Sequence, residues 1–278
     1  LKAQGLQPIG VPLDEEGPQL DVLERIIVQQ RPRFFYTIPS HQNPTGYCAT
    51  PERRRQLIEL SERYGLILVE DDIYARLSYD GPPPPTLKSM DRAGLVVHVG
   101  SVSKLFSPGL RIGYVLAPSP LDRDLLSLRR AADLCSPTML QRAMAEFLAD
   151  GGMKRHLRRV LPLYRTRRNA MLAAMQRHMP PQVMWTKPSG GFTNWLTLPR
   201  LNTFNDLHQA ALHLGWAFAP GEAFLAQADS QHHIRVCFGH QDPTVIGEGI
   251  ATLARLIRER LVEEPTRSHQ VQDWTPMV

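Results

Sequence analysis

Short apolar runs separate amphipathic stretches through the first 120 residues of the chain. Continuous apolar runs are typical of strands covered on both faces of a sheet, whereas apolar residues spaced three and four positions apart predict helices. The strands predicted in this way are Pro8–Leu13, Phe34–Ile38, Leu66–Val69, Leu95–Val99 and Arg111–Ala117. Helices are predicted at Gln19–Val28 and between Thr50 and Gly65. This alternation predicts an α/β fold with a mostly parallel sheet and helices on both faces.

The helix between Thr50 and Gly65 has recognisable signals at both ends. Thr50 is a preferred N-cap, and Pro51 suits the first helical position because its missing N–H would have no partner there. Gly65 suits the left-handed conformation in which helices often stop. The helix is therefore predicted with defined ends.

The pattern changes beyond Leu121, where three helical stretches follow one another. These are Leu121–Leu134, Thr138–Asp150 and Met153–His178, and Pro162 is expected to kink the last one. Short strands then alternate with helices: the strands are Val183–Trp185, Phe192–Leu198, Trp216–Ala219 and His233–Phe238, and the helices are Thr203–Leu214 and Pro243–Leu261. We interpret residues 1–160 as a large domain, residues 161–265 as a smaller C-terminal α+β domain and residues 266–278 as a polar tail without periodicity.

Composition places the chain among globular proteins. Of its 278 residues, 42% are hydrophobic and 21% charged, and the net charge of +5 is too small to argue for nucleic-acid binding. Three widely spaced cysteines fit a reducing cytoplasm, and the lack of about 18 consecutive apolar residues predicts no membrane partner. The first 13 residues read as the end of a helix and a strand, so we interpret the chain as the later portion of a longer protein.

Polar residues follow three of the predicted strands at their carboxyl ends. Asn43 comes after the strand ending at Ile38, Asp71 after the strand ending at Val69, and Ser101 after the strand ending at Val99. In parallel α/β sheets, ligands bind beyond the carboxyl ends of the strands. These residues are therefore expected to converge on one ligand site.

Lys104 follows shortly after this third strand end, in the segment Ser101-Val102-Ser103-Lys104. A lysine whose amine is partly deprotonated can form a Schiff base with an aldehyde. The two serine hydroxyls and the later Arg111 are groups that suit a phosphate monoester. A surface lysine in a polar loop is the alternative, and only the matching residues elsewhere in the chain argue against it.

Each of the other candidate residues also has a purely structural interpretation. Asp71 and Asp72 are ordinary at the end of a strand, Asn43 before a proline is ordinary in a turn, and Arg235 is ordinary on a surface strand. The adjacent histidines at 232 and 233 are not expected to bind a metal, because neighbouring strand residues point to opposite faces. No metal site is predicted. Tyr36 and His41 lie near the expected site and are assigned no role.

Five motifs resemble those of one family. They are Asn43-Pro44-Thr45-Gly46, Asp71-x-x-Tyr74, Ser101-x-Ser103-Lys104 with Arg111, Gly190-Gly191-Phe192 and Ile234-Arg235-Val236. Together they resemble fold-type I pyridoxal-phosphate enzymes of aminotransferase class I/II, in the branch of 2-aminoadipate-type aminotransferases and MocR/GntR-type regulators. The resemblance covers Leu1 to Leu261. It implies the pyridoxal-phosphate-dependent transferase fold and pyridoxal 5′-phosphate as cofactor.

The resemblance also implies a role for each motif. Lys104 would bind the cofactor covalently and move a proton, and Asp71, with Asp72 as a competing candidate, would keep the pyridine nitrogen protonated. Tyr74 and Asn43 would donate hydrogen bonds to the cofactor's phenolic oxygen, and Ser101, Ser103 and Arg111 would form part of the phosphate site. Arg235 would bind the substrate's α-carboxylate, and Asn43 is a second implied substrate-binding residue.

The implied activity is transfer of an amino group between an amino acid and a 2-oxo acid. The alternative is an effector-binding domain of a GntR/MocR-type transcriptional regulator, which would bind DNA only through an upstream winged-helix domain. Other chemistry on the same cofactor is a third possibility. Family members carry a preceding segment with further cofactor ligands and much of the dimer interface, so a homodimer is expected only at full length.

Overall fold

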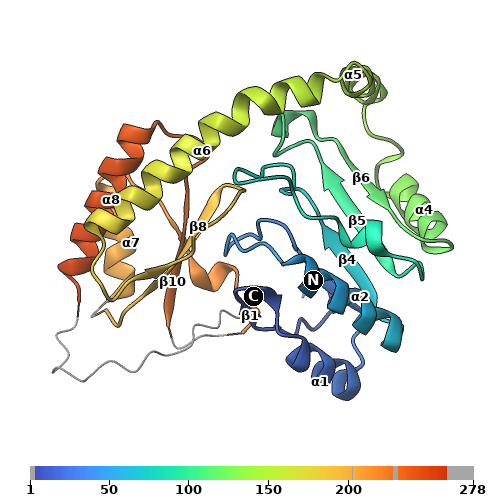
Figure 1. Ribbon diagram of the computed structural model, residues 1–278, viewed down its shortest axis with the longest axis horizontal. Coiled ribbons are helices and arrows are strands. Elements are labelled where there is room, and N and C mark those ends of the chain that lie inside the picture. Colours follow the sequence, from blue (N-terminus) through green and yellow to red (C-terminus); the bar gives the residue numbers. More distant parts are fainter. Residues whose placement is uncertain (1–3, 202, 228–230, 262–278) are drawn as a thin grey trace.

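The computed structural model describes residues 4–201, 203–227 and 231–261. Figure 1 shows two sheets, joined along one side by a long helix. In the first sheet, β3 (Phe34–Thr37), β4 (Ile67–Asp71) and β5 (Val96–Ser101) run parallel, and β6 (Gly113–Leu116) pairs with β5 in the antiparallel direction. The predicted mostly parallel α/β sheet is confirmed.

Three helices pack near this sheet, namely α1 (Leu20–Gln30), α2 (Pro51–Tyr64) and the single turn α3 (Leu87–Met90). Their core side chains include Leu23, Leu57 and Leu87, which are almost completely buried with Leu68 of β4 and Val96 of β5. The apolar stripes of the helices face the sheet because burying them there removes apolar surface from water.

The predicted ends of α2 are confirmed. The Thr50 hydroxyl accepts a hydrogen bond of 3.1 Å from the backbone N–H of Arg53, and Pro51 is the first helical residue. Gly65 closes the helix with a φ of 65°, which a side-chain-free residue adopts without strain.

Three further helices follow the first sheet: α4 (Leu121–Asp133), α5 (Thr138–Ala149) and α6 (Gly152–His178). A short 3₁₀ turn, η2 (Pro108–Leu110), lies between β5 and β6. α6 continues through Pro162 and extends from α5 to α8 (Figure 1). The predicted domain boundary at residue 160 falls inside this helix, and both the division and the kink at Pro162 stay predictions.

The second sheet is antiparallel, with the order β7 (Met184–Trp185), β8 (Thr193–Leu198), β10 (His232–Cys237) and β9 (Ala219–Pro220). It packs with α6, α7 (Phe204–His213) and α8 (Pro243–Arg258), and the 3₁₀ turn η3 (Gly221–Ala223) follows β9. Met175, Leu196, Leu207, Ile234 and Ile257 form the fully buried centre of this core.

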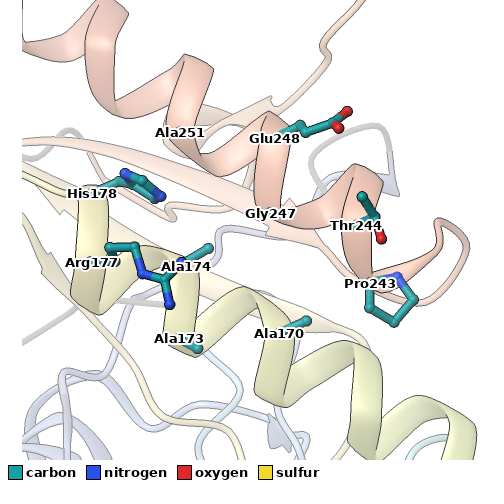
Figure 2. A pocket seen from close by; sticks show the side chains of 10 residues that line it. All are labelled: Ala170, Ala173, Ala174, Arg177, His178, Pro243, Thr244, Gly247, Glu248 and Ala251. Carbon is teal, nitrogen blue, oxygen red and sulfur yellow. The ribbon is translucent and has the colours of Figure 1, made fainter.

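The helices α6 and α8 lie against each other through small residues. A groove of about 330 Å³ lies between them, and Figure 2 shows the side chains that line it. Its lining residues are Ala170, Ala173, Ala174, Arg177, His178, Pro243, Thr244, Gly247, Glu248 and Ala251. Small side chains allow the two helix backbones to approach closely, so this groove follows from helix packing.

Two of the predicted strands are mostly wrong, because only one residue of each lies in a strand. Within Pro8–Leu13 only Leu13 is in a strand, as part of the small hairpin of β1 (Leu13–Asp14) and β2 (Gly17–Pro18). The prolines of that run have no N–H to donate to a ladder. Within Trp216–Ala219 only Ala219 is in a strand. The backbone N–H of Trp216 instead donates to Ala211 at the end of α7, over 2.9 Å.

The predicted polar tail 266–278 lies outside the described residues. Within the described part of the chain, every helix is too short or too polar to cross a membrane.

Candidate active site

The predicted site residues lie at the carboxyl ends of the parallel strands. Asp71 is the last residue of β4 and pairs with Val99 of β5, and Ser101 is the last residue of β5. Asn43 lies in the loop that follows β3. These three residues therefore share one edge of the sheet.

Asp71 is held by Tyr36, a residue to which the sequence analysis assigned no role. The hydroxyl of Tyr36 donates to Oδ2 of Asp71 over 2.6 Å, and the backbone N–H of Ile73 donates to Oδ1 over 3.3 Å. Burial and the hydrogen bond to Asp71 raise the pKa of Tyr36 well above its usual value. Tyr36 pairs with Val69, two residues before Asp71, so both side chains lie on one face. That parallel register is the signal that could have identified Tyr36.

The side chain of Asp72, the competing candidate, points to the opposite face of the sheet from Asp71. Its Oδ2 lies 3.9 Å from Nε2 of His98, and burial followed by the charge of Glu70 raises the pKa of Asp72 to about 6. Asp71, on the face of Tyr36, is thus the carboxylate that is directed toward the expected site.

The loop that carries Asn43 is organised by its own side chains. Oε1 of Gln42 accepts hydrogen bonds from the backbone N–H of Thr45 over 2.9 Å and from its hydroxyl over 2.6 Å. Gly46 has a φ of 74°, and a Cβ there would lie 2.9 Å from Cβ of Pro188. Only glycine fits that position, which explains the last residue of the Asn-Pro-Thr-Gly motif.

A fully buried arginine, Arg54 of α2, joins the two ends of this loop. Its Nη2 donates to the carbonyl of Pro39 over 2.6 Å and to the hydroxyl of Ser40 over 2.9 Å, and its Nε donates to the carbonyl of Ala49 over 3.0 Å. No motif in the sequence pointed to Arg54. A charged side chain so completely buried is stable only when its donors are satisfied, and these carbonyls satisfy them.

His41 packs between this loop and the Gly190-Gly191 motif. The residue is 1% exposed, and Nε2 lies 3.1 Å from the hydroxyl of Ser78. A Cβ on Gly190 would collide with the ring, so glycine is required for this close approach. Burial, with the nearby charge of Arg54, lowers the pKa of His41 to about 4.

Arg235 reaches the Asn43 loop from the second sheet. Its Nη1 donates to Oδ1 of Asn43 over 2.8 Å, and its guanidinium carbon lies 4.5 Å from the ring centre of Phe224. Among the described residues, the buried Nε of Arg235 has no hydrogen-bond partner. The sequence-distant Asn43 and Arg235 therefore meet, and a donor remains available beside them.

Tyr74 lies within electrostatic reach of the same residues. It is buried, with its ring edge-on to Phe192 at 6.3 Å. Burial raises the pKa of Tyr74, the positive charge of Arg235 opposes that rise, and the negative charge of Asp71 adds to it. Asp71, Tyr74, Asn43 and Arg235 thus form one polar neighbourhood.

The segment after β5 carries the predicted lysine. The Ser101 hydroxyl donates to the carbonyl of Ile112 over 3.2 Å and accepts from the backbone N–H of Ser103 over 3.1 Å. Lys104 is exposed in the turn that follows. Arg111 is also exposed, and its Nη1 donates to Pro108 over 3.3 Å. The grouping of Ser101, Ser103 and Arg111 around a phosphate stays a prediction.

A cleft of about 620 Å³ borders this neighbourhood, with Tyr36, Asn43 and Phe224 in its wall. Within the described part of the chain, no three histidine, cysteine, aspartate or glutamate side chains are grouped as metal ligands would be.

Comparisons with known proteins agree with the fold. The chain matches the family Aminotransferase class I and II over residues 1–250. It is 36% identical over 258 residues to aromatic-amino-acid aminotransferase 1 of Thermococcus litoralis, and the match covers 91% of this chain and 62% of that protein. The structure is similar to LysN, the alpha-aminoadipate aminotransferase of Thermus thermophilus complexed with N-(5'-phosphopyridoxyl)-L-leucine. That likeness has a TM-score of 0.84 at 36% identity and covers 90% of this chain and 64% of LysN.

The chain is also 30% identical over 258 residues to an uncharacterized HTH-type transcriptional regulator of Bacillus subtilis, YdfD, covering 93% of this chain and 53% of the regulator. It spans less than two thirds of the length of each of these three relatives. The resemblance inferred from the sequence motifs is confirmed, and the chain belongs to the class I and II aminotransferase family.

Proposed function

We propose that the full-length protein containing this chain is a pyridoxal-phosphate-dependent aminotransferase that acts on an amino acid and a 2-oxo acid. The observation that carries the proposal is the hydrogen bond between Arg235 and Asn43, which brings a guanidinium from the second sheet to the strand ends of the first. Family membership and the similarity to LysN support the same activity.

The residues at the site fit the cofactor by their chemistry. Lys104 offers an exposed amine for the cofactor's aldehyde, and Asp71 offers a carboxylate for its pyridine nitrogen. The buried Nε of Arg235, which lacks a partner among the described residues, is a donor suited to a carboxylate. Ser101, Ser103 and Arg111 would hold the phosphate.

Pyridoxal phosphate, when bound, supplies an electron-accepting ring that lets an amino acid lose its α-proton. The chain's own groups would do the rest. Asp71, fixed by Tyr36, would keep a proton on the pyridine nitrogen. Nζ of Lys104 would take the α-proton from the substrate and deliver it to C4′ of the cofactor. This proton transfer is general acid–base catalysis. Asn43 and Tyr74 would donate hydrogen bonds to the phenolic oxygen.

Arg235 would bind the substrate's α-carboxylate through the planar fork of its guanidinium, with Asn43 beside it. Both half-reactions would use the same site, one with the amino acid and one with the 2-oxo acid, in a ping-pong sequence.

The test is the visible absorbance of the full-length protein with pyridoxal phosphate, together with amino transfer from a panel of amino acids. We expect Lys104→Ala to abolish both the covalent cofactor band and amino transfer. Lys154→Ala is the matched control, because Lys154 is also exposed and lies on α6, outside the motifs. A Lys104→Ala protein with full activity would contradict the proposed function.

The regulator relative supports a second candidate, an effector-binding domain that uses the same pocket to sense its ligand. The full-length reading frame separates the two. An upstream winged-helix segment with specific DNA binding in a mobility-shift assay, and no turnover of any amino acid, would favour the regulator.

The proposal includes a homodimer in the cytoplasm. The dimer is supported by exposed apolar side chains on neighbouring elements, which need a cover: Tyr114, Val115 and Leu116 of β6, and Leu125, Leu126 and Leu128 of α4. Light scattering on the full-length protein is expected to give twice the monomer mass. Cell fractionation is expected to recover the protein with cytoplasmic enzymes.

A further inference from the structure

The two residues that flank Asp71 are both acidic, and both face away from the site. Glu70 is completely buried and pairs with His98 of β5 in the parallel register. Asp72 follows the strand, and its backbone N–H donates to the carbonyl of Val99 over 2.8 Å. Because side chains alternate along a strand, Glu70 and Asp72 lie on the back of the sheet while Asp71 lies on the front with Tyr36.

One imidazole ring stands between these two carboxylates. Nδ1 of His98 lies 2.9 Å from Oε2 of Glu70, and Nε2 lies 3.9 Å from Oδ2 of Asp72. His98 is 5% exposed, and its ring is tilted against the ring of Tyr114 on β6 with 6.0 Å between the ring centres. His98 therefore connects the residue before Asp71 with the residue after it.

Glu70 in turn is anchored to α3. Its Oε1 accepts from the backbone N–H of Leu87 over 2.7 Å, and its Oε2 accepts from that of Lys88 over 3.0 Å. The chain of contacts thus runs from a helix through Glu70 and His98 to Asp72, and the end of β4 is fixed from behind.

A protonated ring would offset the charge of one of the two carboxylates beside it. The hydrogen bond to Glu70 raises the pKa of His98, while burial and the charge of Lys88 oppose the rise. Charges this deeply buried seldom add stability over apolar packing. Fold stability alone therefore does not account for three ionisable groups behind a strand end.

We propose that His98 is a positioning residue for Asp71, because its ring joins the two carboxylates that flank Asp71 and so fixes the direction in which Asp71 enters the site. This inference rests on the proposed function, in which Asp71 binds the pyridine nitrogen of the cofactor. A carboxylate held in place before its ligand arrives binds more tightly than one that must be ordered on binding.

The test is a double-mutant cycle on the full-length protein, with the dissociation constant of pyridoxal phosphate measured by fluorescence titration. The glutamine of His98→Gln can donate to Glu70 but cannot carry a charge to Asp72. We expect His98→Gln to weaken pyridoxal-phosphate binding about tenfold and to have no further effect in an Asp71→Asn background. His213→Gln, which changes an exposed histidine of α7, is expected to bind like the wild type.

Two results would overturn this inference while leaving the proposed function intact. One is wild-type affinity in His98→Gln, and the other is an equal loss with and without the Asp71 carboxylate, which would assign His98 to the fold alone. A wild type that does not bind pyridoxal phosphate would overturn both proposals. Should His98→Gln not fold, Asp72→Asn takes its place in the cycle, with an expected loss of about threefold that again disappears in Asp71→Asn.

Discussion

The guanidinium of Arg235 and the side-chain amide of Asn43 are hydrogen-bonded over 2.8 Å, although 192 residues separate them in the sequence. The bond joins a strand of the antiparallel sheet to a loop at the carboxyl end of the parallel sheet. A guanidinium held at one nitrogen keeps its other donors in a defined plane, which is what recognition of a carboxylate requires. This hydrogen bond makes Arg235 the residue to change in a test of substrate binding.

Arg235→Lys is expected to keep the positive charge and lose the planar fork. Because a lysine binds a carboxylate only as a point charge, we expect KM for amino acids to rise about tenfold to a hundredfold, which corresponds to about 1.4 to 3 kcal/mol. Steady-state kinetics on the full-length protein provides the measurement. The control is Arg255→Lys, which changes an exposed arginine of α8. An unchanged KM in Arg235→Lys would argue against carboxylate binding at this residue.

Tyr36→Phe removes the hydroxyl that holds Asp71 and leaves the ring. A hydrogen bond to a charged acceptor contributes about 1.5–3 kcal/mol when buried, and Tyr36 is half-exposed, so the expected effect is smaller than this range. Pyridoxal phosphate is expected to bind roughly threefold to tenfold more weakly. Titration of the cofactor's absorbance measures this.

Tyr64→Phe removes a comparable hydroxyl, which is bonded to Glu24 far from the site. Equal affinities in the two variants would show that the hydroxyl of Tyr36 does not prepare Asp71.

Arg54→Lys is expected to destabilise the whole domain. The lysine can replace only part of the set of hydrogen bonds to Pro39, Ser40 and Ala49, so buried acceptors on these residues would lose a donor. We expect the free energy of unfolding to fall by about 2–4 kcal/mol. Urea denaturation gives the value, and Arg55→Lys on the exposed side of the same helix is the control. Equal urea midpoints for the two variants would show that Arg54 does not stabilise the fold by joining the two ends of the Asn43 loop.

His41 is expected to make stability depend on pH on the acid side. Its pKa in the folded protein is lowered from 6.5 to about 4, mainly by burial. Between pH 6.5 and about 4, the imidazole of His41 is protonated in the unfolded chain and stays neutral in the folded protein. The stability from this residue is thus complete above pH 6.5 and is lost as the pH falls toward 4, by at most about 3 kcal/mol.

The matching variant is His41→Asn, since asparagine tolerates the positive φ of 52° at this position. Urea denaturation at a series of pH values should give a shallower acid decline for His41→Asn than for the wild type. If the free energy of unfolding fell equally with pH in both proteins, His41 would not be the cause of the acid decline.

Much of the fold was determined by local signals in the sequence. The apolar runs predicted β3, β4, β5 and β6, because β-branched and aromatic residues are enriched in strands. The N-cap at Thr50 and the stop at Gly65 were predicted because both depend on a few adjacent backbone groups. Asp71 and Asn43 were assigned to one edge of the sheet because parallel strands end together.

The sequence alone did not show which side chains meet. The bond from Tyr36 to Asp71 depends on the register of two strands, and the bond from Arg235 to Asn43 depends on how the two sheets are placed. The burial of Arg54 and of His98 likewise follows from packing against segments distant in the chain. Strand periodicity is a local property of the backbone, whereas burial, charge pairing and pKa are set by neighbours that only the tertiary structure brings together.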